Sequence, residues 1–348
     1  MPLLEVKDLH TCFKTRRGIV HAVNGVSFSL ELGKTLALVG ESGSGKSVSA
    51  MSILRLLDSN GYIESGGIYF DDGERRVDLT ALAPDKMRAI RGNQISVIFQ
   101  EPMTALNPVF SIEKQLREPF EIHRSMKKKQ ARAAAETMLE SVHIQNPKRV
   151  LKGYPHQLSG GMRQRVMISM ALSCRPRILI ADEPTTALDV SVQSQILSLM
   201  KELQAENDTA ILFITHDLGV VGEMADDVAV MYCGQVVERV PVPVLFQKHG
   251  YSHPYTEGLL RSAPSAKRAG KRLESIPGSV PTPFALPKGC KFSPRCPYCT
   301  QKCVEEEPAL FAVPSEKGVY QHAIRCFYPK KEERKSARHR QITLDQES

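Results

Sequence analysis

The stretch GESGSGKS at residues 40–47 decides the fold class of this chain. It matches the pattern G-x-x-x-x-G-K-[ST], and it separates an apolar run at 35–39, which predicts a strand, from a helical periodicity at 46–57. In such a unit the glycines let backbone N–H groups wrap a phosphate, and the helix N-terminus adds partial positive charge. The stretch therefore predicts a nucleotide-binding loop built from Gly40, Glu41, Ser42, Gly43, Ser44, Gly45, Lys46 and Ser47.

Two side chains of this phosphate loop have predicted roles of their own. Lys46 should reach the β- and γ-phosphates, and Ser47 should be a ligand of Mg²⁺. A chance turn rich in glycine and serine is the alternative, and the position between a strand and a helix argues against it.

An apolar strand that ends in two acids, RILIADE at 177–183, supplies a second set of candidates. Asp182, at the carboxyl end of the strand, can hold Mg²⁺ through water. Glu183 is then placed to orient or deprotonate the water that attacks the phosphate. Such a pair could instead cap a helix, but its place downstream of a phosphate loop favours phosphoryl transfer.

The segment LSGGMRQR at 158–165 opens a predicted helix. Ser159 is a plausible N-cap, and the pair Gly160 and Gly161 leaves backbone N–H groups uncovered, so this is a second helix start that can receive an anion. An ordinary capped helix is the alternative. Spacing alone does not say whether both helix starts meet the same phosphate.

The order of the predicted elements indicates an α/β fold. Strands and helices alternate along the chain, which is typical of a parallel α/β core, and a helical stretch at about 102–175 interrupts the alternation as an inserted subdomain. After about residue 240 prolines become frequent, and we expect a small irregular domain at 251–330 followed by a disordered charged tail at 331–348. The predicted strands are 22–30, 35–39, 94–99, 178–181 and 210–215, and the predicted helices are 46–57, 113–123, 128–142, 160–173 and 191–206.

Composition places the chain among ordinary soluble proteins. Of its 348 residues 42% are hydrophobic and 24% charged, and no run approaches the roughly 18 apolar residues of a membrane-spanning helix. The start MPLLEVKDLH lacks a secretory signal, so we expect a cytosolic chain that reaches a membrane only through partners. The net charge of +8 comes from local basic runs without interleaved aromatic residues, so no nucleic-acid partner is expected.

Five of the eight cysteines crowd residues 290–326. Because cytosolic chains rarely keep disulfides, this density suggests a metal site. Iron–sulfur ligation and structural zinc both suit four thiolates on a small irregular domain, and unligated thiols are the third possibility. Cys299 is a fifth candidate ligand.

Taken together, LSGGMRQR, GESGSGKS and ILIADEP resemble the signature set of the ATP-binding cassette family, over roughly residues 3–260. The resemblance implies an ATPase domain at 1–250 with a mixed β-subdomain, the parallel core and the helical subdomain. Several residues then acquire expected roles: Phe13 stacks on adenine, Gln100 senses Mg²⁺ as a ligand and contacts the transmembrane partner, Asp189 in the loop 187–189 crosses a dimer interface, and His216 contacts the γ-phosphate.

The family pattern also implies partners. Two cassettes face each other head to tail, so that the signature at 159–161 serves the nucleotide of the second cassette, and subfamily resemblance favours a related chain as that second cassette. Two membrane-embedded permease subunits and an extracytoplasmic binding protein complete such an importer. The chain would then lie peripherally on the cytoplasmic face of the cell membrane.

The end of the chain narrows the resemblance. HPYT at 253–256, IPGS at 276–279 and GCKFSPRCPY at 289–298 are similar to the dipeptide, oligopeptide and nickel importer ATPases. Peptide import is therefore expected; import of nickel or another small solute is the near alternative, and a soluble cassette protein of translation or DNA repair the distant one. The cysteines Cys290, Cys296, Cys303 and Cys326 resemble the pattern that holds a 4Fe-4S cluster in some members, with zinc as the alternative.

Overall fold

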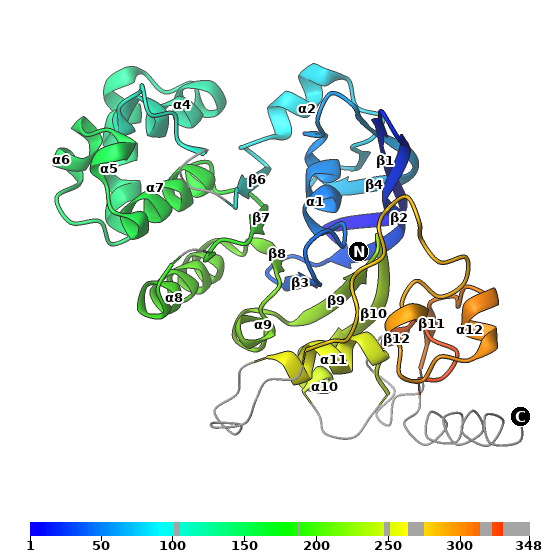
Figure 1. Cartoon of the computed structure of the whole chain (residues 1–348). Helices are drawn as coiled ribbons and strands as arrows, with labels where there is room; N and C mark the ends of the chain where they lie inside the picture. Colours follow the sequence, from blue (N-terminus) through cyan, green and yellow to red (C-terminus); the bar gives the residue numbers. More distant parts are fainter. Residues whose placement is uncertain (101–104, 187, 247–250, 264–274, 314–321, 330–348) are drawn as a thin grey trace, which may run out of the picture. The chain divides into compact units, whose positions relative to one another are not determined.

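The computed structural model describes residues 1–100, 105–186, 188–246, 251–263, 275–313 and 322–329 (Figure 1). By its internal contacts the chain forms two compact units, and each consists of several chain segments. The first unit comprises Met1–Glu5, Ser29–Thr35 and Ile68–Ile214, and the second comprises Val6–Phe28, Leu36–Gly67 and Thr215–Ser348.

The first unit contains a parallel sheet in which β7 lies between β6 and β8. Its strands are short and mostly apolar, and all of their residues except Val97 are buried, as expected of a sheet covered on both faces. The register pairs Ile178 with Ala210 and Asp182 with Ile214, so Asp182 stands at the carboxyl end of the sheet. The strands are β6 (Ile95–Ile98), β7 (Ile178–Asp182) and β8 (Ala210–Thr215).

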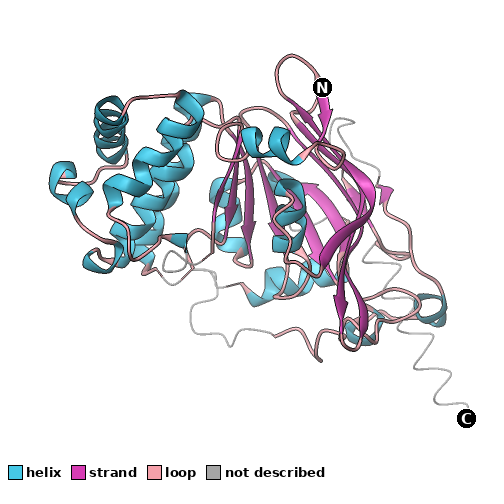
Figure 2. Cartoon of the chain, turned by 90° about the horizontal axis from the view of Figure 1, so that it is seen from above, coloured by secondary structure: helices cyan, strands magenta, loops and turns pink. Residues whose placement is uncertain are grey.

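Between β6 and β7 the chain forms a group of helices in which α4 packs on α5, α6 and α7 (Figures 1 and 2). Small and branched apolar side chains are buried in these helices, among them Leu116, Ala135 and Leu139. Ser111 caps α4, because its hydroxyl accepts a hydrogen bond from the N–H of Lys114. The helices of this unit are α2 (Pro84–Ile90), α4 (Ile112–Arg124), α5 (Lys128–Ser141), α6 (Pro147–Lys152), the 3-10 turn Pro155–Gln157, α7 (Gly160–Leu172) and α8 (Val190–Asn207).

In the second unit β3 runs parallel to β9, and β9 pairs antiparallel with β10. Every residue of β3 is buried, and α1 starts a few residues after its end. The apolar core of this unit includes Tyr232, Tyr255 and Phe292, which lie far apart in the sequence. The elements are β3 (Thr35–Val39), α1 (Lys46–Leu54), α9 (Leu218–Met224), β9 (Asp227–Tyr232) and β10 (Gln235–Pro241).

The C-terminal part of the second unit is mostly irregular, with short elements around the cysteines. Its strand β12 adds to the sheet next to β10, and β11 pairs with β12. The elements are α10 (Val242–Leu245), α11 (Pro254–Ser262), the 3-10 turn Ser293–Arg295, α12 (Gln301–Glu305), β11 (Phe311–Ala312) and β12 (Ala323–Ile324).

A second sheet has the strand order β2-β1-β4-β5. Three of its strands are long, and each contributes residues to both units of the chain. They are β1 (Leu4–Thr15), β2 (Gly18–Leu30) and β4 (Gly61–Asp71), and the fourth strand is β5 (Arg76–Asp78).

The predicted α/β class is confirmed, and so is a strand at 210–215. The predicted helix 46–57 was too long, because Arg55 adopts φ 52° and its N–H closes the end of α1 at Leu54. The domain boundaries at 1–250, 102–175 and 251–330 stay predictions, and the tail at 331–348 lies outside the described residues. No helix in the described part of the chain has the length and apolar character to cross a bilayer.

Candidate functional site

The phosphate loop of the second unit has the backbone that its glycines predict. Gly45 is the N-cap of α1 with φ 98°, a left-handed value that favours glycine. A Cβ at this position would lie 2.5 Å from the carbonyl oxygen of Ala22. The loop therefore depends on the absence of a side chain at Gly45, and it leads directly into the N-terminus of α1, where the helix dipole adds partial positive charge.

Lys46 is buried inside this loop. Its ammonium group donates hydrogen bonds to the carbonyl oxygens of Gly40 at 2.7 Å and Glu41 at 3.1 Å. A buried ammonium held by carbonyl dipoles is a fixed positive charge, which suits an anion in the loop. Ser47, the next residue of α1, is exposed.

Two further predicted residues belong to the same unit. Phe13 on β1 lies against Gly61 of β4, where a Cβ would come within 2.7 Å of the phenyl ring. His216 is exposed in the short connection between β8 and α9. The aromatic ring of Phe13 is thus partly covered on one side by its own sheet.

A group of contacts that the sequence did not predict ties the phosphate loop to the C-terminal part of the unit. The N–H of Glu41 donates to the phenol oxygen of Tyr255 at 2.8 Å. The carboxylate of Glu41 accepts two hydrogen bonds from Arg295, at 2.6 and 3.1 Å. Glu41 occupies a variable position of the loop pattern and Arg295 lies 254 residues further on, so no local signal connects them.

In the first unit the predicted acids stand at the end of β7. Asp182 is buried, and Glu183 follows with φ 46°, which is unusual for a residue with a Cβ. The Glu183 carboxylate accepts hydrogen bonds from Gln100 Nε2 at 3.1 Å and from the hydroxyl of Thr186 at 2.9 Å. The structure therefore brings two of the predicted site residues, Gln100 and Glu183, together, and it adds Thr186.

The signature segment begins α7 as the sequence predicts. Ser159 is the N-cap, and its hydroxyl accepts from the N–H of Met162 at 3.3 Å. A Cβ on Gly160 would meet no heavy atom within 4 Å in the described residues, whereas one on Gly161 would lie 3.1 Å from Val192. Nothing described in this chain accounts for a glycine at 160.

The signature helix is linked to the acids of β7 by a residue that the sequence did not single out. Gln164 of α7 is buried, and its amide donates to the carbonyl oxygen of Pro184 at 2.5 Å. Asp189 caps α8, because its carboxylate accepts from Ser191 and from the N–H of Val192. The hydrogen bond from the Ser191 hydroxyl is the main cause that lowers the pKa of Asp189 below its ordinary value. Ala187 of the same loop lies outside the described residues.

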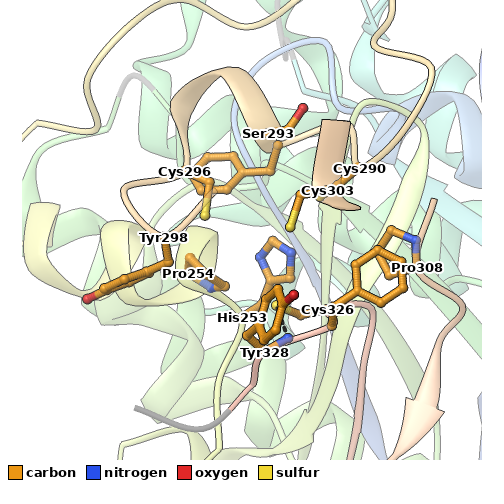
Figure 3. A pocket seen from close by; sticks show the side chains of 12 residues that line it. His253, Pro254, Cys290, Ser293, Cys296, Tyr298, Cys303, Pro308, Cys326 and Tyr328 are labelled. Carbon is orange, nitrogen blue, oxygen red and sulfur yellow. Dashed lines mark hydrogen bonds between the residues drawn. The ribbon is translucent and has the colours of Figure 1, made fainter. Parts of the chain in front are cut away.

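The four predicted cysteine ligands line one pocket in the second unit (Figure 3). The sulfur atoms of Cys296 and Cys303 point toward the same space, beside the imidazole of His253. Most of the other walls are apolar or aromatic. The lining residues are His253, Pro254, Cys290, Phe292, Ser293, Cys296, Tyr298, Cys303, Pro308, Cys326, Phe327 and Tyr328.

Two of the four thiols, those of Cys290 and Cys296, have pKa values well above that of an ordinary cysteine. Burial, with smaller contributions from the neighbouring cysteines, raises the pKa of Cys290 and of Cys296 to about 12. Without a cation both are neutral thiols at pH 7, and a bound cation would reverse that balance. Cys299 does not line the pocket, and its sulfur contacts the carbonyl oxygen of Thr300 at 3.6 Å.

A buried carboxylate holds the pocket against the sheet. Glu238 of β10 accepts the N–H of His253 at 2.8 Å, and its other oxygen lies 2.8 Å from Nε2 of His322. His253 in turn caps α11, since its Nδ1 accepts from the N–H of Tyr255. One histidine of the HPYT segment therefore orders both the helix start and the pocket wall.

Comparison with known families gives two matches. Residues 23–186 match the family described as ABC transporter. Residues 237–303 match the family described as oligopeptide/dipeptide transporter, C-terminal region.

Similar proteins cover nearly the whole chain. The oligopeptide transport ATP-binding protein AppD of Bacillus subtilis is 51% identical over 326 residues, which are 93% of this chain and 96% of AppD. The oligopeptide transport ATP-binding protein OppD of Haemophilus influenzae is 48% identical over 87% of this chain and 91% of OppD. A solved dimeric structure of the ATP-binding cassette MJ0796, bound to ADP and phosphate, aligns with TM-score 0.60 and 26% identity over 69% of this chain and 98% of that one.

Proposed function

This chain belongs to the ATP-binding cassette family, and we propose that it is the ATP-hydrolysing subunit of a transporter that imports peptides. The similarity to AppD and OppD carries the proposal, because it extends from the phosphate loop through the C-terminal region specific to oligopeptide and dipeptide transporters. The test is uptake of labelled dipeptides and oligopeptides by cells with and without the chain. Uptake of nickel in the same cells tests the alternative substrate.

The phosphate loop supports a role in holding ATP. Backbone N–H groups at the start of α1 and the buried ammonium of Lys46 would contact the β- and γ-phosphates. Ser47 would be a ligand of Mg²⁺, and Phe13 would stack on the adenine. These assignments rest on the loop geometry and on the family pattern.

Hydrolysis would use the acids that follow β7. Glu183 would act as the general base on the attacking water, Gln100 would orient that water and Mg²⁺, and Asp182 would hold Mg²⁺ through water. The hydrogen bonds from Gln100 and Thr186 support the assignment, because they fix the Glu183 carboxylate in one orientation. His216 would contact the γ-phosphate.

The signature segment would serve the nucleotide of a second cassette. Gly160 supports this, since a side chain there would meet nothing in the described chain, so a partner or its ligand is the reason for glycine. The solved cassette MJ0796 is dimeric. In such a pair Ser159, Gly160 and Gly161 reach the second ATP, and Asp189 lies at the interface.

The remaining partners follow from import. Two membrane-embedded permease subunits would carry the peptide, an extracytoplasmic binding protein would deliver it, and a related chain would be the second cassette. This chain would then be peripheral on the cytoplasmic face of the cell membrane. Co-purification of permease subunits with the tagged chain tests this assembly, and their absence would favour a non-transport cassette.

The cysteine pocket fits a 4Fe-4S cluster held by Cys290, Cys296, Cys303 and Cys326. Four cysteines line one largely apolar pocket, which is the donor set and the setting of such clusters. In the described residues no three of these sulfurs lie within 4.8 Å of one another. Tetrahedral zinc would bring its sulfurs to about 3.8 Å, given Zn–S bonds of about 2.3 Å. Four thiolates suit the cluster and suit structural zinc as the alternative, and in either case the role would be structural.

A further inference from the structure

The contacts of Glu41 point to a link between the cysteine pocket and the ATP site. We propose that Arg295 and Tyr255 are positioning residues that hold the phosphate loop in its binding conformation and transmit the state of the cysteine pocket to it. This proposal rests on the proposed ATP-binding function of the loop.

The two contacts act on one residue of the loop from both sides. Tyr255 fixes the backbone of Glu41 through its N–H, and Arg295 fixes the side chain through a two-pronged ion pair. The Arg295 side chain is 4% exposed and that of Glu41 is 31% exposed, so the arginine side of the pair is shielded from solvent.

Arg295 is itself held in place by the protein. Its guanidinium donates to the carbonyl oxygen of Pro277 at 3.0 Å and to the phenol oxygen of Tyr232 at 3.4 Å. Tyr232 and Tyr255 pack on each other, with ring centroids 4.7 Å apart. The loop contact is therefore made by a rigid group rather than by a mobile surface side chain.

The same turn carries two of the pocket cysteines. Ser293 donates its N–H to the carbonyl oxygen of Cys290, and Cys296 donates its N–H to that of Ser293, so residues 290–296 form one compact turn. Arg295 directly precedes Cys296 in it. Because ligands on a metal fix the backbone that bears them, loss of the metal would loosen the turn that presents Arg295.

Pre-organisation gives the expected signature. We call the contacts of Tyr255 and Arg295 with Glu41 the clasp. Without the clasp, the nucleotide-free loop spends part of its time in conformations that do not bind ATP. The apparent affinity for ATP then falls, while the bound state is unchanged. We expect Tyr255→Phe and Arg295→Gln to raise the KM for ATP about tenfold and to leave kcat within about twofold, since each removes a hydrogen-bond partner from a partly buried group of Glu41.

The test is equilibrium binding of ATP to the full-length chain, wild type and variants, with melting temperatures measured in parallel. Arg261→Gln is the matched control, because it breaks the 3.5 Å ion pair with Glu257 on α11 and lies outside both the phosphate loop and the turn 290–296. Equal ATP affinity of wild type, Tyr255→Phe and Arg295→Gln would refute the clasp and leave the proposed function standing. A wild type that does not bind ATP would instead refute the proposed function.

Removal of iron tests whether the state of the cysteine pocket affects the phosphate loop through Arg295. ATP affinity of the wild-type chain should fall when iron is chelated, and Arg295→Gln, already uncoupled, should show a much smaller change. An equal loss of affinity in both chains, or none in the wild type, would refute transmission through Arg295.

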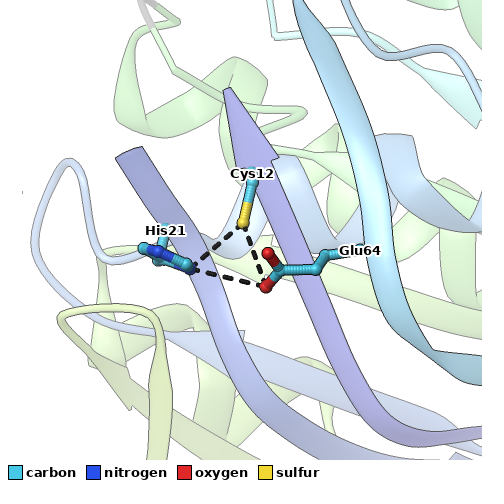
Figure 4. Close-up of side chains that lie close together, drawn as sticks. All are labelled: Cys12, His21 and Glu64. Atoms are coloured by element: carbon cyan, nitrogen blue, oxygen red, sulfur yellow. Dashed lines mark hydrogen bonds and ion pairs between the residues drawn. The ribbon is translucent and has the colours of Figure 1, made fainter. Parts of the chain in front are cut away.

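An independent observation carries a second proposal. Three neighbouring strands of the second unit place Cys12 of β1, His21 of β2 and Glu64 of β4 together (Figure 4). The distances are 3.1 Å from Cys12 Sγ to His21 Nδ1, 3.5 Å from Cys12 Sγ to Glu64 Oε2, and 3.6 Å from His21 Nδ1 to Glu64 Oε2. We propose that these side chains form a site for a borderline divalent metal ion such as Zn²⁺.

The spacing matches that chemistry. Tetrahedral zinc with Zn–S bonds of about 2.3 Å and Zn–N or Zn–O bonds of about 2.0 Å sets neighbouring ligand atoms about 3.3–3.5 Å apart. The separations of 3.1, 3.5 and 3.6 Å between the three side chains lie within a few tenths of an ångström of those values, so small side-chain shifts would complete the site. Three protein ligands on a sheet surface leave the fourth position to water, since the side chains of His21 and Glu64 are 49% and 41% exposed. Burial and Glu64 raise the pKa of Cys12 to about 11, so binding must displace the thiol proton.

Zinc binding to the full-length chain tests this site. Wild type should bind one more equivalent of Zn²⁺ than Cys12→Ser or His21→Ala, and at pH 8 it should release one more proton. His10→Ala, on the same strand outside the triad, is the matched control and should bind as wild type does. Because the comparison is between variants, metal in the cysteine pocket does not affect it. Identical zinc stoichiometry in wild type and both triad variants would overturn the proposal.

Discussion

Gln100 donates a hydrogen bond of 3.1 Å from Nε2 to Oε2 of Glu183, and the same oxygen accepts the hydroxyl of Thr186. Glu183 also carries a left-handed backbone, with φ 46°, and its N–H bonds to the carbonyl oxygen of Ile214 at 2.9 Å. A non-glycine residue keeps such a conformation only where its surroundings impose it. The backbone conformation of Glu183 and the hydrogen bonds to its side chain therefore both fix the orientation of the carboxylate.

Glu183→Gln should lower ATP turnover by about 10²–10⁴-fold, the usual contribution of a general base, while ATP binding is retained. The amide keeps the shape of the carboxylate but accepts no proton. Turnover and equilibrium binding are measured on the same preparation, and Glu202→Gln, an exposed acid on α8, is the control. Wild-type turnover in Glu183→Gln would show that another group is the base.

Lys46→Ala should weaken ATP binding at least about tenfold, because it removes a buried positive charge from the loop. The carbonyl oxygens of Gly40 and Glu41 also lose their donor, so some loss of stability is expected. Lys201→Ala on the exposed face of α8 is the matched control. Unaltered nucleotide affinity in Lys46→Ala would contradict the phosphate-loop assignment.

Substitution by alanine should affect stability at Gly45 and activity at Gly160. Gly45→Ala places a Cβ against the carbonyl oxygen of Ala22 at φ 98°, so it should lower the melting temperature. Gly160→Ala meets open space, so the melting temperature should stay the same while ATP hydrolysis by the paired cassettes falls. Calorimetry and turnover of the assembled pair separate the two. Full activity of Gly160→Ala would mean that nothing approaches this glycine closely.

Local motifs allowed the sequence to predict the phosphate loop, the signature helix and the acids after β7, because each is a continuous stretch with a fixed backbone requirement. Arg55 escaped prediction because its left-handed conformation carries no glycine signal. The contacts of Glu41 with Tyr255 and Arg295 escaped for another reason. They join chain segments more than 200 residues apart, and although Tyr255 lies in HPYT and Arg295 in GCKFSPRCPY, nothing in either stretch points to Glu41.

The cysteines also show what the sequence could not predict. Their density in the sequence predicted a metal site, but five candidates for four positions left the ligand set open to reasoning from the residues alone. In the structure Cys290, Cys296, Cys303 and Cys326 line the pocket, which supports that set of four, whereas Cys299 lies outside the lining but still interacts with Cys303. The sequence could not place Cys326 there, because the path of the chain brings it to the pocket next to β12.

That difference gives a matched pair of variants. Cys296→Ser should lose most of the iron of anaerobically purified chain and its brown colour, because serine removes one of four thiolate ligands. Cys299→Ser should keep both, although it lies only three residues away. Without iron, Cys290 should react slowly with alkylating reagents at pH 8, since its pKa is raised to about 12 and the thiolate is scarce.

Iron, zinc and sulfide analysis of wild type, Cys296→Ser and Cys299→Ser checks this prediction. One equivalent of zinc with no iron in the wild type would overturn the cluster, and loss of iron in Cys299→Ser would overturn the ligand set. The pair also tests the role of the pocket in the fold. Because Cys290 and Cys296 belong to the turn that presents Arg295, the iron-free Cys296→Ser chain should bind ATP more weakly, and Cys299→Ser should bind it as the wild type does.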